Sequence, residues 1–353
     1  MGQPFKFLSK KISRDHGTQH CVGRNAAIQA ASYHRPSLTV PRLLVAIVSW
    51  NSSLHLRDAV ASVPEGVPVL VVDNASSDGS AEIARSAGAR VIEAGANLGF
   101  GPACNRAARE GAPSETILFL NPDAALVDGP RTLAALLQAL DADPAVAAVA
   151  PRLAGDGQER FQLRRLPSIG SIVRDALLVD RLFPENPGFR HDRYLDRDRD
   201  TAFDVEQPAA AALLVRRDAF EALGGFDPAF LPAWFEDVDF CARLLESGRR
   251  IRYVPEGRAT HVGGVTMNAL PYRDFRPAYV RNLFQYLARH ASPGVRAVAR
   301  FSTLLGALVR VALLLFVRPD HPRLDAAVAH ARVVRGLLGL GWRSALLPGG
   351  RAA

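Results

Sequence analysis

Apolar runs and amphipathic stretches alternate along the first half of the chain. Residues 42–51 read RLLVAIVSWN, a continuous apolar run typical of a strand buried on both faces. The run at residues 67–72 repeats this form, as do shorter runs near residues 90 and 117. Helical patterns separate these runs, at residues 55–63, 80–87, 102–110 and 130–141. Strands that alternate with helices predict an α/β fold with a mostly parallel central sheet.

Polar clusters follow each of the four expected strands. They read SWN, DNASSD, NLGFGPACN and NPD. In open α/β sheets, ligands bind beyond the carboxyl ends of the strands. The sequence therefore predicts a ligand-binding crevice formed by four loops.

The pattern changes at residues 155–207. This segment is rich in Arg, Asp and Pro and has no clear periodicity, which predicts an irregular excursion over the sheet. A strand and a helix follow, and the helix ends at Gly224 and Gly225. A further strand with a loop brings His261 before a glycine pair.

Residues 233–244, AWFEDVDFCARL, place Glu236, Asp237 and Asp239 among aromatic and aliphatic side chains. One interpretation is a pocket wall, where carboxylates acquire shifted pKa values and are used in chemistry. The other is a solvated helix N-terminus in which Asp239 pairs with Arg243, four residues later. These twelve residues alone leave both interpretations open.

Composition indicates an ordinary globular protein. The chain has 353 residues, 48% hydrophobic and 22% charged, which excludes wholesale disorder. Its three cysteines, Cys21, Cys104 and Cys241, lack metal-ligand spacing. We interpret them as reduced thiols of a cytoplasmic protein.

The net charge of +8 is concentrated at the two ends. Residues 1–40 carry six Lys or Arg against one Asp, and residues 293–353 carry nine Arg against two Asp, so the middle is mildly acidic. Such a middle makes a poor nucleic-acid surface, and we expect no nucleic-acid partner. Basic, apolar ends suit an anionic membrane surface, although arginines that only keep a helical tail soluble explain the pattern equally well.

These features divide the chain into three parts. Residues 1–40 lack the apolar core of a secretory signal and are expected to form a poorly ordered basic extension. Residues 41–292 form the main domain, with the predicted parallel strands at 41–150 and the acidic segment within 151–292. Residues 293–353 form a basic apolar helical tail. Its apolar segment, residues 301–317, contains Arg310 and favours a membrane-surface or packing helix over a membrane span.

Seven blocks together resemble family 2 glycosyltransferases of the GT-A fold, and the rhamnosyltransferase-like branch above all. The resemblance covers residues 42–265 in the order of the family. The blocks are VAIVSWN, VVDNASSDGS, NLGFGPACN, LFLNPDA, LLVRRDAFEALGGFDPAF, WFEDVDFCARL and YVPEGRATHVGG.

The resemblance implies a nucleotide-sugar site at the strand ends. Asp73 matches the aspartate that binds the nucleotide base, and Trp50 would stack on that base. The other matched positions line the nucleotide, with the glycine allowing close backbone approach. They are Asn74, Asn97, Gly99, Asn105, Asn121 and Asp123.

The resemblance also implies a divalent cation, Mn²⁺ or Mg²⁺. Asp123 ends a motif that usually reads Asp-x-Asp and binds the cation that bridges the diphosphate. This sequence has the neutral Asn121 in the first position. His261 matches a histidine that completes the metal shell in relatives, and an imidazole ligand favours Mn²⁺.

Asp237 matches the catalytic base of the family, which takes the proton of the acceptor hydroxyl. Glu236 and Asp239 would position Asp237, hold the acceptor or raise its pKa. Direct displacement predicts inversion at the anomeric carbon.

The expected function is an inverting, metal-dependent glycosyltransferase on the inner face of the cell membrane. It would transfer L-rhamnose from dTDP-rhamnose to a glycan or polyprenyl-diphosphate-linked acceptor of a surface polysaccharide. Arg164 and Arg165 are candidates for contact with that diphosphate, with a solvated basic turn as the other interpretation. A non-catalytic nucleotide-sugar-binding partner subunit is the alternative function, and a two-carboxylate glycosidase is a weaker one.

Overall fold

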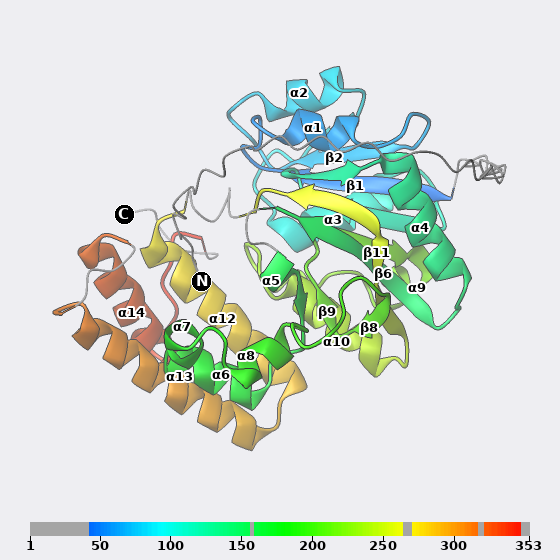
Figure 1. Cartoon of the computed structure of the whole chain (residues 1–353). Coiled ribbons are helices and arrows are strands. Elements are labelled where there is room, and N and C mark those ends of the chain that lie inside the picture. The colour runs from blue at the N-terminus through cyan, green and yellow to red at the C-terminus, as the bar shows by residue number, and fades with distance from the viewer. Residues whose placement is uncertain (1–41, 156–158, 264–269, 317–320, 347–353) are drawn as a thin grey trace, which may run out of the picture. The chain divides into compact units, whose positions relative to one another are not determined.

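The computed structural model of the protein describes residues 42–155, 159–263, 270–316 and 321–346 (Figure 1). Residues 39–353 belong to one compact unit. The expected basic extension at residues 1–40 lies outside the described residues.

The strands form one large mixed sheet with the order β3-β2-β1-β4-β10-β6-β11-β5. Parallel pairing joins β1 to β2 and β4, β2 to β3, and β6 to β11, whereas β10 is antiparallel to β4 and β6. This confirms the mostly parallel sheet. The strands are β1 (Leu43–Ser49), β2 (Val69–Asp73), β3 (Arg90–Glu93), β4 (Thr116–Leu120), β5 (Ala124–Val127), β6 (Val146–Ala154), β10 (Ala212–Arg216) and β11 (Arg250–His261), with β8 (Phe203–Val205) paired to β11.

The strand order explains where a ligand can bind. From β1 the chain passes outward through β2 and β3, and then returns to place β4 on the other side of β1. This reversal is a topological switch point, at which the loops after two neighbouring strands diverge and leave room for a ligand. The loops that begin at Trp50 and Asn121 lie at this point.

Each central strand is buried on both faces, which accounts for its continuous apolar sequence. In β1, Ala46 and Val48 belong to one core cluster, whereas Val45 and Ile47 belong to the other. The second cluster includes residues of α1 (Leu56–Ala61) and α4 (Gly129–Asp141). Helix α2 (Ser80–Ser86) packs beside α1.

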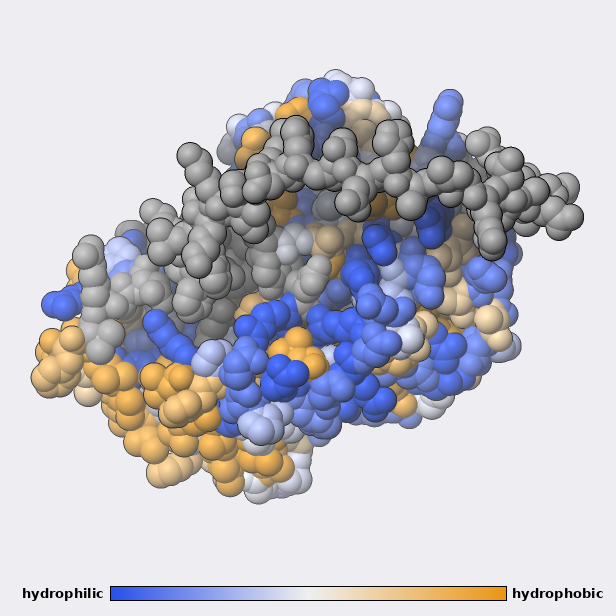
Figure 2. All heavy atoms as spheres, viewed as in Figure 1, coloured by the Kyte–Doolittle hydropathy of each residue, from blue (hydrophilic) through white to orange (hydrophobic). Residues whose placement is uncertain are grey.

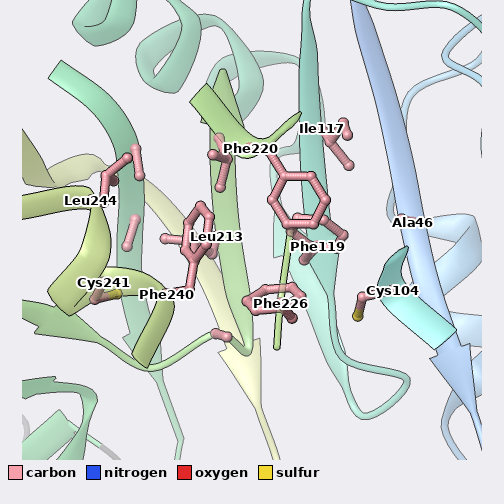
Figure 3. Packing of buried hydrophobic residues seen from close by; sticks show 14 of the residues in the cluster. Ala46, Cys104, Ile117, Phe119, Leu213, Phe220, Phe226, Phe240, Cys241 and Leu244 are labelled. Carbon is pink, nitrogen blue, oxygen red and sulfur yellow. The ribbon is translucent and has the colours of Figure 1, made fainter. Parts of the chain in front are cut away.

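An aromatic group forms much of the first cluster (Figure 3). Phe119 of β4 meets Phe220 of α9 (Arg217–Ala222), with ring centroids 5.1 Å apart. Phe226 contacts both rings, and Phe240 of α10 (Glu236–Glu246) closes the group. Cys104 of α3 (Phe100–Glu110) lies in the same cluster. The core therefore fixes α3 and α10, the two helices that border the candidate site.

The prediction that residues 155–207 are irregular is wrong for most of the described part. The segment contains α5 (Glu159–Gln162), β7 (Leu163–Arg164), α6 (Ile169–Ala176), α7 (Val179–Leu182), α8 (Pro187–Asp192) and β9 (Gln207–Pro208). Ser168 caps α6, and Arg174 pairs with both Asp180 and Asp192. Helices this short do not produce a detectable period, and several of their charged residues pair with one another, as Arg190 does with Glu185 at the surface.

Three long helices complete the chain. They are α12 (Tyr272–His290), α13 (Pro293–Leu313) and α14 (Arg323–Leu337). Helix α13 contacts α6 and α14, and α14 contacts α12. Of the helices in the described part of the chain, none is both long and apolar enough to cross a membrane.

Candidate active site

The first two polar loops are joined by hydrogen bonds at the carboxyl ends of β1 and β2. Asp73 ends β2 and is buried, and both of its carboxylate oxygens accept hydrogen bonds from Ser76. The backbone N–H of Asn51 also donates to the Ser76 hydroxyl. Trp50 lies at the start of this turn and is partly buried. The turn therefore holds Asp73 and Trp50 next to the switch point, where a nucleotide base is expected.

The third polar loop, which contains Asn97 and Gly99, is held in place by hydrogen bonds within the protein. Asn74 is buried and donates to the carbonyl of Gly99, and the Asn97 side chain accepts from the N–H of Gly99. Gly99 has φ +85°, and a Cβ atom there would lie 2.6 Å from the carbonyl oxygen of Pro232. The close approach that this glycine permits is thus to the loop that precedes the acidic residues of α10.

Asn105 was expected to line the nucleotide, but the structure gives it a structural role. Its side-chain amide donates to the carbonyl of Phe226 at 2.7 Å and its oxygen accepts from the N–H of Phe226 at 2.9 Å. This two-way bond ties α3 to the segment before α10, 121 residues later in the chain. A contact between Asn105 and the nucleotide stays a prediction.

Asn121, Asp123 and His261 come together, as the resemblance implies. His261 ends β11, and its Nε2 atom lies 3.3 Å from the Asp123 carboxylate and 3.4 Å from the Asn121 amide. Asp123 also accepts from the N–H of Gly263. Burial acts to raise the pKa of Asp123, but the contacts with His261 and Gly263 outweigh it and leave the pKa below its usual value. Asp123 is therefore held as a carboxylate.

Asp123 and His261 bring one carboxylate oxygen and one imidazole nitrogen within 3.3 Å of each other, and both are donors that a divalent cation accepts. Among the described residues, no group of three or more His, Cys, Asp and Glu side chains is arranged to hold a metal ion. The pair fits a cation whose remaining ligands come from a diphosphate and water.

The acidic residues of α10 differ in their surroundings. Asp237 is partly exposed and accepts a hydrogen bond from the Gln207 side chain at 3.0 Å. Its other oxygen accepts from the N–H of Val238. Glu236 is only 5% exposed, and its Oε2 atom has no hydrogen-bond partner among the described residues. Asp237 is thus the carboxylate that a substrate can reach.

Burial raises the pKa of both carboxyl groups. The effect is large for Glu236, where the adjacent charge of Asp237 adds to it. For Asp237, burial outweighs the opposing charge of Arg164 and the backbone N–H groups. Raised pKa values bring a carboxylate closer to the range in which it works as a general base at neutral pH.

The interpretation of Asp239 as a residue that holds the acceptor is wrong, because the side chain is completely buried. One oxygen accepts from Arg243 at 2.7 Å, and the other lies 2.9 Å from Nε2 of His290 on α12. The bond from Arg243 to Asp239 is present, as the helix interpretation expected, but the solvated terminus of that interpretation is wrong because Glu236 and Asp239 are both buried. Asp239 anchors α10 to α12.

A strained loop, residues 231–235, carries α10 into position. Trp234 and Phe235 both have φ +74°, a conformation that bulky residues rarely adopt. Asn282 of α12 is completely buried, and its amide group donates to the carbonyls of Leu231, Ala233 and Trp234. Sequence reasoning missed Asn282, because nothing near it in the chain indicates a catalytic segment.

Comparison with known proteins agrees with this geometry. The model of glycosyl transferase family 2 matches residues 44–224. The N-acetylglucosaminyl-diphospho-decaprenol L-rhamnosyltransferase of Mycobacterium tuberculosis is 31% identical over 288 residues, covering 75% of this chain and 90% of that protein. Rhamnosyltransferase WbbL of Escherichia coli K12 is 32% identical over 100 residues, covering 28% of this chain and 37% of that protein.

The fold is also similar to that of solved glycosyltransferases. A mannosyltransferase from Pyrobaculum calidifontis, in complex with GDP-Man and Mn²⁺, superposes with a TM-score of 0.50 at 19% identity, covering 85% of this chain and 82% of that one. The expected GT-A fold and the resemblance to rhamnosyltransferases are therefore confirmed. This chain belongs to glycosyl transferase family 2 and is a glycosyltransferase.

Proposed function

We propose that this enzyme transfers L-rhamnose from dTDP-rhamnose, with inversion, to a sugar linked to a polyprenyl diphosphate. The identity to the mycobacterial rhamnosyltransferase, over most of both chains, supports rhamnose as the sugar and a polyprenyl-diphosphate-linked acceptor. The single structural observation that carries the proposal is the position of Asp237. It is the accessible carboxylate of α10, with its pKa raised and its orientation fixed by Gln207.

Asp237 acts as the general base. The acceptor hydroxyl attacks the anomeric carbon of the donor sugar, and the bond from that carbon to the diphosphate oxygen breaks. The hydroxyl proton passes to the Asp237 carboxylate, which makes the oxygen a better nucleophile. Attack from the face opposite the leaving group inverts the anomeric carbon.

The donor site is formed by residues of the strand ends. In the proposal, Trp50 and Asp73 bind the nucleotide base, Asn97 lines the nucleotide, and Asn121 orients the side chains around the diphosphate. Asp123 and His261 hold a divalent cation, which supplies charge neutralisation to the departing diphosphate. The 3.3 Å approach of Asp123 to His261 supports this pairing.

We also propose that α13 rests on the membrane that holds the acceptor. Exposed apolar side chains recur along it at spacings of three and four residues, at Val298, Phe301, Leu305 and Leu308, and continue to Leu315 and Phe316. Figure 2 shows this apolar surface as a continuous orange area along the outer edge. Such a stripe beside exposed arginines suits a helix that lies in the plane of an anionic membrane surface.

A donor survey tests the proposal. Release of nucleoside diphosphate is measured from dTDP-rhamnose, UDP-glucose, UDP-GlcNAc, UDP-galactose and GDP-mannose, with lipid extract as acceptor and Mn²⁺ present. We expect release from dTDP-rhamnose alone, and we expect EDTA to abolish it. Release from another donor instead would overturn the sugar assignment, and full activity in EDTA would overturn the role of Asp123 and His261.

A further inference from the structure

Three arginines act electrostatically on one side chain, Tyr279, and one of the three, Arg276, is paired with a carboxylate, Asp175. They come from three separate segments: Arg164 from β7, Arg193 from the residue after α8, and Arg276 from α12. We propose that Arg164 and Arg193, together with Arg276, bind the diphosphate group of the lipid-linked acceptor. This inference rests on the proposed function, because it concerns the acceptor of that reaction.

The position of Arg164 follows from strand pairing. Strands β7 and β9 are antiparallel, and Arg164 lies directly opposite Gln207. Side chains opposite each other in an antiparallel pair share one face of the sheet. Because Gln207 donates to Asp237, Arg164 lies one side chain away from the base. Its guanidinium donates to the carbonyl of Phe161, and no carboxylate of the described residues pairs with it.

Arg193 lies next to Arg164, since both meet at Phe161. Its guanidinium carbon is 5.2 Å from the centre of the Phe161 ring and 5.4 Å from that of Phe189. Its Nη1 atom is buried and has no hydrogen-bond partner in the described part of the chain. Burial and the charge of Arg164 lower the pKa of Arg193 to about 10.

The two carboxylates whose charges act on Arg193 are shared with another arginine. Asp180 and Asp192 both bind Arg174, so their charge is partly compensated. A partly buried cation with shared counter-charges is favourably placed for an anionic ligand. Arg193 is therefore built to receive an anion.

Arg276 extends this group toward α10. It is 5% exposed, its Nε atom has no partner among the described residues, and its nearest carboxylate, Asp175, lies 3.7 Å away. Its guanidinium carbon is 5.8 Å from the centre of the Tyr279 ring. That ring packs against Phe235, the residue before Glu236, with centroids 5.1 Å apart.

Electrostatics links the three arginines at Tyr279. Burial and Asp175 raise the pKa of its hydroxyl, and the charges of Arg164, Arg276 and Arg193 act against them. The charges of all three guanidinium groups thus act to lower the pKa of the same side chain, Tyr279. Guanidinium groups bind phosphate oxygens through paired charge-assisted hydrogen bonds, which makes phosphate the expected class of anion.

The chemistry of the acceptor indicates which phosphate group the arginines bind, namely its diphosphate. In a sugar joined to a lipid by a diphosphate, the attacked hydroxyl and the diphosphate are separated by one sugar ring. A base at Asp237 therefore requires an anion site about one sugar ring away, on the acceptor side. Figure 2 shows hydrophilic surface over the region of α5 and α8, adjoining the apolar surface of α13. The diphosphate and the lipid chain of an acceptor match these two surfaces.

Binding of geranyl diphosphate tests the site without any need for turnover. Isothermal titration is performed on the full chain saturated with dTDP and Mn²⁺, so that the donor site is occupied. We expect Arg164→Gln and Arg193→Gln each to weaken binding about 10- to 100-fold, the effect of losing a hydrogen bond to a charged group. Arg190→Gln is the matched control. Arg190 lies three residues from Arg193, is exposed and pairs with Glu185, so this variant should bind like the wild type.

Geraniol, which lacks the diphosphate, should bind all four proteins equally weakly. Wild-type affinity for geranyl diphosphate in both Arg164→Gln and Arg193→Gln would overturn the proposal. An equal loss of affinity in Arg190→Gln would also overturn the proposal, because it would indicate general electrostatic attraction. The melting temperature of each variant shows whether it is folded. If Arg193→Gln does not fold, Arg164→Gln still tests the proposal, because Arg164 is partly exposed. Failure of rhamnose transfer in the wild type leaves this binding result intact, so the two proposals fail separately.

Discussion

Glu236 and Asp237 are adjacent carboxylates with different tasks. Asp237 is reachable and hydrogen-bonded, whereas Glu236 is buried between α10 and α3, and a Cβ atom on Gly101 would lie 3.4 Å from the Glu236 Cβ. The pKa of Glu236 lies well above its usual 4.5. Folding thus favours the neutral form of Glu236 over its charged form.

The pH dependence of stability tests this division. A carboxyl group whose pKa is raised by folding stabilises the protein below its unfolded pKa, near 4.5, and that stabilisation is lost as pH rises through the folded pKa. Glu236→Gln imitates the neutral form at every pH. We expect the variant to melt at the same temperature as the wild type at pH 4 and at increasingly higher temperatures toward pH 8. The free energy of unfolding of the variant is then expected to be larger by about 1–3 kcal/mol. A constant difference across this range would contradict the assignment.

At the residue scale, sequence reasoning could place a side chain where its position follows from the local chain, although its role in the site stays a prediction. His261 ends β11, Asp237 lies in the first turn of α10, and Asp123 lies in the turn between β4 and β5, so these positions were predictable. The roles of Asn105 and Asp239 were not, because each depends on a partner far away in the sequence, Phe226 and His290 respectively. A polar side chain gives no signal of which distant group it will bond.

At the scale of elements, α10 depends on helix α12 for its position. Asn282 holds the strained loop before α10, and His290 binds Asp239 within α10. Trp234 and Phe235, two residues with positive φ, keep this conformation only when the surroundings fix it. Helix α12 therefore holds the loop and the helix that carry Asp237.

Asn282→Ala tests the role of α12. Without the amide, three buried carbonyls lose a donor and the loop can relax, which displaces Asp237. We expect kcat to fall about 100-fold with the KM for the donor unchanged, since small displacements of a base have effects of this size. Arg289→Ala, on the same helix but paired with Asp227, is the control and should keep its kcat. Equal losses in both variants would point to general damage to α12.

Element prediction succeeded where the pattern was long and failed where it was short. The four N-terminal strands and their helices were predicted because each has a buried face repeated over several residues. Strand β6 was not predicted, although its sequence VAAVAPRLA is mostly buried, because its small residues and internal proline weaken the strand pattern. The antiparallel insertion of β10 between β4 and β6 depends on contacts between distant segments, which periodicity does not reveal.

At the scale of the whole molecule, the proposed membrane contact depends on the exposed apolar stripe of α13. In the sequence, the basic excess lies at the two ends of the chain. The tail was predicted as a membrane-surface or packing helix, and its buried side contacts α6 and α14. The stripe has no partner among the described residues.

Vesicle binding tests this surface. Phe301→Glu with Leu308→Glu should reduce binding to phosphatidylglycerol vesicles at least about tenfold, because each buried large apolar side chain contributes about 1.5–3 kcal/mol. The control carries the same added charge at exposed positions elsewhere, Ser86→Glu with Gln138→Glu. Equal binding by both double variants would show that the stripe does not meet the membrane.

Rhamnose transfer tests the role of Asp237 most directly. Product is measured by mass spectrometry after incubation of dTDP-rhamnose with a short-chain GlcNAc-diphosphate-polyprenol and Mn²⁺, for the wild type and Asp237→Asn. We predict rhamnosylated lipid from the wild type, and a rate about 10²- to 10⁴-fold lower in the variant with unchanged affinity for dTDP. Transfer by Asp237→Asn at the wild-type rate would contradict the central claim that Asp237 is the base.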